Sequence, residues 1–364
     1  MTLTGPALAI MVTVATIAAM VGAFLGWSRV PGSVWMRHGL RLLLLVGNQL
    51  AAVLLVGVIA NDAGNFYSSW SDLFGSGGSG ALARSHVRTQ ATPRAGVLTS
   101  NDTGFAARGQ WPLRGRLVSI TVSGRVSQLR AVAFVYLPPQ YFQPRYAKTS
   151  FPAIELLTGY GHPVSQLAGR GAAPDVLLRL IRRGAVPPAV LVITSAAPGV
   201  GRDTECVDVP AGPQAATFLG VDIPLAISHT YRVATVGWGI GGIGEGGYCA
   251  AKLAMLQSDV FYSGASIAGY YTPLRTAATG DLWAGSAVQR RLDDLTWRLR
   301  HLPAPPARLL VLQSPGVTSD QAFAALARPP MQVIVQDTAQ PGDPARNDLP
   351  AALSWLSRHL PGPP

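Results

Sequence analysis

A glycine-rich stretch at residues 237–254, GWGIGGIGEGGYCAAKLA, lies between an apolar run and a helical pattern. One site built on such a turn is the G-x-G-x-x-G fingerprint, which cradles a dinucleotide pyrophosphate at a helix N-terminus. Gly239, Gly241 and Gly244 satisfy it literally. The fingerprint also requires an acid at the end of the next strand, about 20 residues later. Asp259 precedes the next apolar run instead of ending it, so the pattern disfavours a dinucleotide site.

The other candidate is the nucleophile elbow, G-x-S-x-G, a strained strand-to-helix turn that exposes a serine. Aligned on residues 242–246, its serine position is Gly244, which has no side chain. Glu245, beside the turn, could act as a base or a nucleophile. Ser263, Ser266 and Cys249 are also near the turn, but none of these four side chains has an identifiable catalytic partner. The sequence therefore predicts an elbow kept as a turn after its nucleophile was lost.

The elements that position this turn alternate between strands and helices. LVSITVSGRVSQLRAVAFVYLPP, from about Trp111 onward, predicts an antiparallel hairpin around Ser123 and Gly124. Predicted strands follow at FPAIELL, AVLVITSAAP, YRVATVGWGI, ARLLVLQSP and MQVIVQ, and predicted helices at DVLLRLIRRG and LPAALSWLSRHL. This alternation indicates an α/β fold with a mainly parallel sheet, helices on both faces and the hairpin as an antiparallel N-terminal edge.

The N-terminal region is strongly apolar. No charged residue occurs at positions 5–28 or 42–61, and each run is about as long as a membrane-crossing helix. Arg29, Arg37 and Arg41 lie between the runs, and short basic loops stay on the cytoplasmic side of a membrane. We therefore expect two transmembrane helices with both termini outside. The alternative is a single anchor followed by a buried helix.

Three regions follow from these patterns. Residues 1–62 are expected to form the two-span transmembrane hairpin. Residues 63–110 form a juxtamembrane segment and a flexible linker, because their Gly, Ser and Arg content cannot bury a core. Residues 111–364 form the folded domain. The predicted location is the cell membrane, with the C-terminal domain extracytoplasmic.

Net charge and cysteine content limit the classes of partner and cofactor that the protein could bind. The formal net charge of +11 and the pI near 10.2 are compatible with nucleic acid, but no aromatic-interleaved basic cluster supports it. Anionic lipid or wall polymer fits an outward-facing domain better, and a solvated basic surface is the alternative. The spacing of Cys and His suggests no metal site, and no cofactor is expected. We expect Cys206 and Cys249 to form one disulfide in an oxidising compartment, and two buried free thiols are the alternative.

Several strings together resemble the putative esterase family of α/β hydrolases, relatives of the mycolyltransferases. They are GIGEGGYCAAKLAMLQSDVF with ASIAGYY, VYLPPQYF, FPAIELLTGYGH, DTECVDVP and LPAALSWLSRHL. The apolar N-terminus with FYSSWSDLFG is similar to membrane-anchored actinobacterial members. The resemblance covers roughly residues 111–360 and implies an α/β-hydrolase fold. It also implies a serine nucleophile, a histidine base and an acid.

The catalytic set that this resemblance implies is incomplete here. The nucleophile position is Gly244, as above. The histidine should precede the C-terminal helix, but TAQPGDPARND contains none, and Gln340 falls near its expected place. The acid is expected after ARLLVLQSP, where Asp320 is either a remnant of the acid or a solvated loop aspartate.

The resemblance also implies a pocket and an oxyanion region, lined by Gly159, Tyr160, Gly161, Glu245 and Tyr248. His162 is the one histidine that could approach it, unless it serves a structural hydrogen bond.

Three hypotheses follow. The first is an extracytoplasmic pseudoenzyme that binds an acyl chain, an envelope glycolipid or an envelope protein. The second is an active esterase or acyltransferase with a displaced catalytic set, such as Glu245 and His162. The third is an outer domain that only scaffolds its neighbours. Fold resemblance does not choose among them, because function resides in sites.

Overall fold

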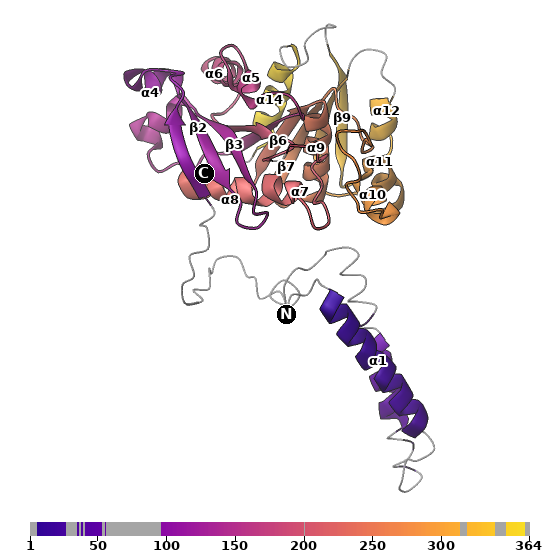
Figure 1. Cartoon of the computed structure of the whole chain (residues 1–364). Coiled ribbons are helices and arrows are strands. Elements are labelled where there is room, and N and C mark those ends of the chain that lie inside the picture. Colours follow the sequence, from indigo (N-terminus) through magenta and orange to yellow (C-terminus); the bar gives the residue numbers. More distant parts are fainter. Residues whose placement is uncertain are drawn as a thin grey trace, which may run out of the picture. The chain divides into compact units, whose positions relative to one another are not determined.

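The structure is a computed structural model. It describes residues 6–26, 35, 38, 41–52, 55, 96–199, 201–313, 319–338 and 347–360. The chain divides into two compact units, Met1–Gln90 and Ala91–Pro364 (Figure 1).

The N-terminal unit contains α1 (Pro6–Gly26) and a second helical segment at residues 41–52. The buried Thr16 hydroxyl donates to the Val12 carbonyl oxygen at 2.8 Å and to the Ala51 carbonyl oxygen at 3.4 Å. This second hydrogen bond joins the two helical segments.

The prediction of two transmembrane helices is wrong. No helix among the described residues has both the length and the apolar character needed to cross a membrane. Among the described residues, the first uncharged run forms α1, and the second is helical at residues 42–52 and 55.

The second unit is built on one nine-stranded sheet with the order β1-β2-β3-β5-β4-β6-β7-β8-β9. The strands are β1 (Gly96–Asp102), β2 (Arg116–Ser123), β3 (Arg130–Leu137), β4 (Ala153–Thr158), β5 (Val190–Ser195), β6 (Trp238–Ile243), β7 (Phe261–Ile267), β8 (Arg308–Gln313) and β9 (Gln332–Asp337). The pairs from β1 to β5 are antiparallel, and the pairs from β5 through β4 to β9 are parallel. The sequence predicted this mainly parallel sheet and its antiparallel N-terminal edge.

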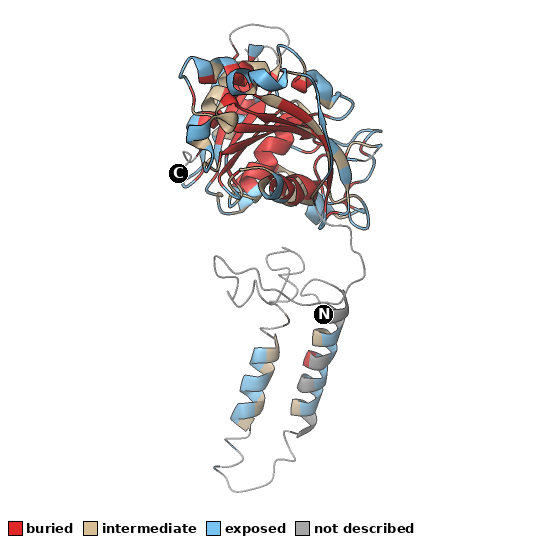
Figure 2. Cartoon of the chain, turned by 90° about the vertical axis from the view of Figure 1, so that its left-hand side faces the viewer, coloured by how far each residue is buried: buried red, intermediate tan, exposed pale blue. Residues whose placement is uncertain are grey.

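Helices cover both faces of the sheet. The longer ones are α6 (Ala173–Arg182), α8 (Ile223–Thr230), α9 (Glu245–Leu256) and α14 (Leu349–Arg358). Shorter ones are α4 (Trp111–Arg114), α5 (Val164–Ala168), α7 (Ala215–Thr217), α10 (Ala287–Asp293), α11 (Leu295–His301), α12 (Ser319–Ala324), η1 (Arg108–Gln110), η2 (Pro139–Phe142), η3 (Pro144–Tyr146) and η4 (Phe218–Asp222). One core cluster packs α8 and α9 on the sheet, and the other packs α6 and α14 on the opposite face (Figure 2).

Strand β1 lies within residues 63–110, the segment expected to be a linker. It pairs with β2, and Thr99 and Thr121 share a hydroxyl hydrogen bond of 2.9 Å. The Arg116 side chain forms an ion pair of 2.9 Å with Asp102. The sheet therefore begins ahead of Trp111, the residue near which the sequence placed the start of the folded domain.

The order of the central strands locates a site. From β4 the chain goes to β5 on one side and then returns to β6 on the other side of β4. Such a reversal leaves a crevice outside the carboxyl ends of the two strands, where α/β proteins bind ligands. The segment after β4 and the turn after β6 meet at this edge.

Candidate functional site

Gly244 forms the turn between β6 and α9. Its φ of 61° and ψ of −119° lie in a region that L-residues rarely adopt. Its N–H donates to the Ile267 carbonyl oxygen at 2.9 Å, and its own carbonyl oxygen accepts from the Tyr248 N–H at 3.1 Å. This is the sharp strand-to-helix turn that a nucleophile elbow requires. A Cβ at position 244 would meet no atom within 4 Å, so a side chain here would have space.

The neighbouring glycines have a different role. A Cβ on Gly242 would lie 2.2 Å from the Gly246 carbonyl oxygen, and a Cβ on Gly246 would lie 2.2 Å from the Leu157 carbonyl oxygen. These positions are glycine because the start of α9 passes directly over the backbones of β4 and β6. Of these three glycines, Gly244 is the one at which the packing leaves room for a side chain.

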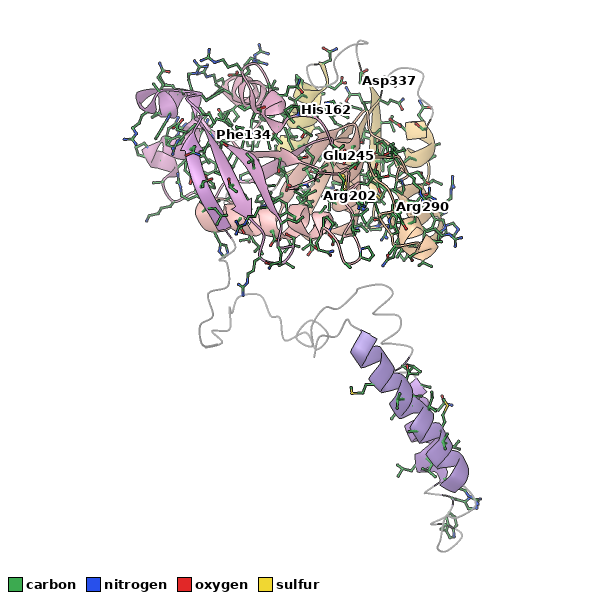
Figure 3. The ribbon with its side chains drawn as sticks, in the orientation of Figure 1. Phe134, His162, Arg202, Glu245, Arg290 and Asp337 are labelled. Atoms are coloured by element: carbon green, nitrogen blue, oxygen red, sulfur yellow. A yellow bond between two sulfur atoms is a disulfide. The ribbon has the colours of Figure 1, made fainter. Side chains whose placement is uncertain are left out.

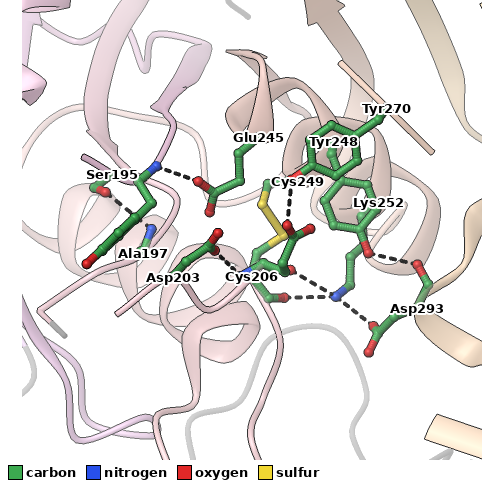
Figure 4. The surroundings of a disulfide bond; sticks show 12 residues. Ser195, Ala197, Asp203, Cys206, Glu245, Tyr248, Cys249, Lys252, Tyr270 and Asp293 are labelled. Atoms are coloured by element: carbon green, nitrogen blue, oxygen red, sulfur yellow. Dashed lines mark hydrogen bonds and ion pairs between the residues drawn. A yellow bond between two sulfur atoms is a disulfide. The ribbon is translucent and has the colours of Figure 1, made fainter. Parts of the chain in front are cut away.

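The Glu245 side chain occupies the position next to the elbow. An elbow site stabilises an oxyanion with the N–H after the nucleophile and an N–H from the loop after a preceding strand. In this chain those donors are the Glu245 and Tyr160 N–H groups. The Tyr160 N–H donates instead to Oε2 of the Glu245 carboxyl group, the hydrogen bond drawn at Glu245 in Figure 4. The chain's own carboxyl group thus engages one of the two donors.

Two further acids lie close to Glu245, both on the loop after β5. Glu205 is fully buried, and its Oε1 accepts a 2.7 Å hydrogen bond from the Tyr270 hydroxyl. Asp203 accepts a 2.9 Å hydrogen bond from the Glu205 N–H. Among the described residues, Oε1 of Glu245 and Oε2 of Glu205 are buried without a hydrogen-bond partner.

These surroundings shift the proton affinities of both glutamates. Burial raises the pKa of Glu245 to about 8; the Tyr160 N–H opposes this shift, and the acids at positions 203 and 205 add to it. Burial also raises the pKa of Glu205 to about 7, partly offset by the Tyr270 hydroxyl. Both groups therefore retain protons at pH values where an exposed carboxyl group has lost its proton.

The predicted disulfide between Cys206 and Cys249 is present, with Cα atoms 5.8 Å apart. It joins the loop that carries the two acids to helix α9 (Figure 4). Glu205 and Cys206 have φ values of 47° and 45°, in the left-handed region that non-glycine residues rarely adopt. The disulfide therefore holds a strained loop beside the elbow.

A buried ion pair supports the same loop. Lys252, on α9, forms an ion pair with Asp293 at 2.6 Å. Its ammonium group also donates to the Cys206 carbonyl oxygen at 3.0 Å and to the Glu205 carbonyl oxygen at 3.4 Å. This cation is thus committed to Asp293 and to the loop backbone.

The other residues of the predicted oxyanion region are placed as follows. Gly159 is next to Glu245, because a Cβ on it would lie 3.4 Å from the Glu245 Cβ and Oε2. Gly161 has a φ of 76° and is exposed. Tyr248 is fully buried, stacks on Tyr270 with ring centroids 5.0 Å apart, and donates its hydroxyl to the Asp293 carbonyl oxygen. Tyr248 is therefore part of the packed wall.

His162 lies near Glu245 but is not bonded to it. Its Cδ2 would be 3.7 Å from a Cβ on Gly159, and Figure 3 shows both side chains at this edge of the sheet. Within the described part of the chain, no hydrogen bond or ion pair joins the exposed imidazole to Glu245. The His162 N–H closes a turn to the Gly159 carbonyl oxygen at 3.2 Å.

The positions predicted for the catalytic acid and histidine give less evidence about the site. Asp320 lies in the first turn of α12 and is buried, so it is not a solvated loop aspartate. The Ser319 hydroxyl donates to it at 3.0 Å, and burial raises the pKa of Asp320. Gln340 lies outside the described residues. No group of His, Cys, Asp or Glu within the described ranges is arranged to hold a metal ion.

Sequence reasoning missed the side chains that define this site most closely: Asp203, Glu205, Lys252, Tyr270 and Asp293. DTECVDVP was the one available signal, because its cysteine lies between acids and the partner Cys249 lies on the elbow helix. A disulfide between the two segments would have brought the acids to the elbow.

The two glutamates predict how stability depends on pH. Each has a folded-state pKa above its usual value near 4.5, so the unfolded chain binds fewer protons between that value and about 8. We expect their contribution to the free energy of unfolding to be complete below pH 4.5 and lost as pH rises to about 8. Urea unfolding at a series of pH values measures it. Glu205→Gln and Glu245→Gln should each flatten the dependence, and an unchanged slope in both would contradict the assignment.

Comparisons with known proteins identify the fold. The family model described as Putative esterase matches residues 127–341, more than half of the chain. No curated protein matches. A ferulic acid esterase structure is 19% identical, covers 68% of this chain and 100% of its own, and has a TM-score of 0.55. An S-formylglutathione hydrolase from Agrobacterium tumefaciens is 14% identical, with coverages of 73% and 100% and a TM-score of 0.56.

A third structure, FphF, a fluorophosphonate-binding serine hydrolase of Staphylococcus aureus, is 12% identical. It covers 67% of this chain and 98% of its own, with a TM-score of 0.50. At these identities the structures show a shared fold and not a shared activity. The narrower resemblance to mycolyltransferases stays a prediction. The chain belongs to the family described as Putative esterase and has the α/β-hydrolase fold of that family.

Proposed function

We propose that this protein is a non-catalytic member of the esterase family that uses the elbow site to bind a ligand. One observation carries the proposal: the nucleophile position is Gly244, in elbow geometry with open space where a side chain would be. Acyl transfer on this fold needs a hydroxyl, a base and an acid. The sequence has no histidine between His301 and His359, which removes the expected base as well.

The proposed ligand is an acyl chain, an envelope glycolipid or an envelope protein, and the proposed location is extracytoplasmic. The disulfide between Cys206 and Cys249 supports this location, because disulfides persist in oxidising compartments. A relationship to mycolyltransferases would fit a lipid of the envelope. Lipid extraction of the purified protein tests the ligand, and a chain that copurifies with no lipid would favour a scaffolding role.

Ester hydrolysis tests the loss of catalysis. We expect the full-length protein to hydrolyse p-nitrophenyl butyrate at a rate roughly 10⁶-fold below a working serine hydrolase, because both Ser and His are missing. A fluorophosphonate probe should not label it. Gly244→Ser should fold and remain nearly inactive, since the new hydroxyl has no base. Labelling of a wild-type serine would mean that a nucleophile exists elsewhere.

One observation favours a second candidate function, an esterase with a displaced catalytic set. The pKa of Glu245 is raised to about 8, and a carboxyl group with a shifted pKa beside an elbow could act as a general base. Under this alternative, Glu245→Gln would abolish a measurable wild-type turnover, and so would His162→Ala. If wild-type turnover is absent, or is unaffected by either change, this candidate fails.

A further inference from the structure

The side chain of Glu245 lies where a ligand of an elbow site would bind. Its Oε2 accepts from the Tyr160 N–H, although the two residues are 85 positions apart in the sequence. Its Cβ and Oε2 both lie 3.4 Å from the position of a Cβ on Gly159. The carboxyl group is therefore seated in the loop after β4, not extended into solvent.

We infer that the Glu245 carboxyl group is an internal ligand of this site, and that it must leave before a carbonyl or carboxylate group of another molecule can bind the Tyr160 N–H. The inference concerns the site of the proposed function, but it does not depend on whether the protein is catalytic. It makes Glu245 a gate for ligands that carry an oxygen acceptor.

Two features stabilise the seated position. Glu245 is the first residue of α9, a helix of 12 residues whose N-terminal N–H groups have no acceptor in the helix. A negative charge there is favoured by the helix dipole. The loop that donates the Tyr160 N–H is held in place separately, because the Tyr160 hydroxyl donates to the Gly201 carbonyl oxygen at 3.1 Å. The donor and the carboxyl group are thus both positioned by the surrounding structure.

The neighbours of Glu245 make the gate sensitive to pH. Asp203 and Glu205 face it from the loop after β5, and Tyr270 faces the same acids from the segment after β7. His162 is the nearest histidine, on the loop after β4. The Lys252 ammonium, with Tyr248 on the same helix, is committed to Asp293 and the loop backbone.

Protonation strengthens the seated state. The helix N-terminus favours the charged form, but burial and the neighbouring acids outweigh it and raise the pKa of the seated Glu245 to about 8. A released, exposed carboxyl group has its usual pKa near 4.5, so the seated form gains stability as pH falls below about 8. Removal of the internal ligand should therefore raise acetate affinity more at pH 6 than at pH 9.

The test follows the Tyr160 amide by NMR in the full-length protein. Its chemical shift should titrate with a midpoint near 8 in the wild type and should not titrate in Glu245→Gln, whose amide oxygen can still accept. Acetate, which stays ionised from pH 6 to 9, is the ligand probe. Glu245→Ala, which lacks the internal ligand, should bind acetate at least about tenfold more tightly than the wild type at pH 6, where the wild-type Glu245 is protonated and seated, since one charge-assisted hydrogen bond becomes available.

Two matched variants separate occupancy from charge. Glu245→Gln removes the negative charge but keeps an acceptor, and Asp203→Asn removes a neighbouring charge while its side-chain oxygen can still accept from the Glu205 N–H. Both should bind acetate within about threefold of the wild type at pH 6, well short of the gain from one freed hydrogen bond.

An equal gain in Asp203→Asn and Glu245→Ala would show that charge alone matters and would overturn the inference. A wild-type Tyr160 amide that does not titrate, or one that still titrates in Glu245→Gln, would also overturn it. None of these measurements uses turnover, so an active enzyme would refute the proposed function and leave this test intact.

Discussion

Gly246→Ala is expected to lower the free energy of unfolding by more than about 4 kcal/mol or to prevent folding. The new Cβ would lie 2.2 Å from the Leu157 carbonyl oxygen and 2.8 Å from its carbonyl carbon. Both are backbone atoms of β4, a strand buried along its whole length, so no flexible side chain can move aside. The start of α9 would have to lift off the sheet, which breaks the packing of the elbow. Urea unfolding followed by circular dichroism measures the loss.

Gly244→Ala is the matched control, two residues away in the same turn. Its Cβ would meet no atom within 4 Å, and the cost is the strain of a sparsely populated backbone conformation, about 1–3 kcal/mol. The pair therefore separates close packing from backbone strain. If Gly246→Ala were no more destabilising than Gly244→Ala, the close approach of α9 to β4 would be wrong.

The double variant Cys206→Ser, Cys249→Ser is expected to lose about 4 kcal/mol of stability. The disulfide closes a loop with a sequence separation of 43, and a cross-link of that length removes a corresponding amount of unfolded-state entropy. Without the disulfide, the left-handed conformations at Glu205 and Cys206 would lose a covalent restraint and keep the hydrogen bonds from Lys252 and Tyr270. Denaturant unfolding with and without reductant measures the effect.

The control is reduction itself. Reductant should destabilise the wild type by about the same amount and should leave the double variant unchanged. A wild type that is insensitive to reductant under unfolding conditions would contradict a structural disulfide. Fluorescence of the tyrosines near the loop gives a second readout, because Tyr270 is bonded to Glu205.

Strand and turn patterns predicted much of the sheet. Apolar runs bounded by turn residues correspond to β4, β5, β6 and β8, because strands buried on both faces are continuously apolar, and a further run corresponds to the partly exposed edge strand β9. The antiparallel edge was also visible in the hairpin of β2 and β3. A related criterion, the length of an uncharged apolar run, failed at the N-terminus. Uncharged runs there met the length and composition of a membrane span, but no helix among the described residues is both long and apolar enough to be one.

At the elbow, the sequence determines which residues are present, and the folded structure determines what surrounds them. The absence of a nucleophile at Gly244, the missing histidine and the presence of two cysteines are chemical facts of the sequence. They needed only a motif and its spacing, and the proposal of a non-catalytic binding protein is based on them.

Tertiary structure alone decided what surrounds that turn. The Tyr160 N–H meets Glu245 across 85 residues, and Cys206 brings Asp203 and Glu205 to α9. The raised pKa values follow from this burial and from charges that are close only in the folded chain. Hydrogen bonds and electrostatic interactions act over a few ångströms in space, and no local pattern along the chain records which distant segments come within that range.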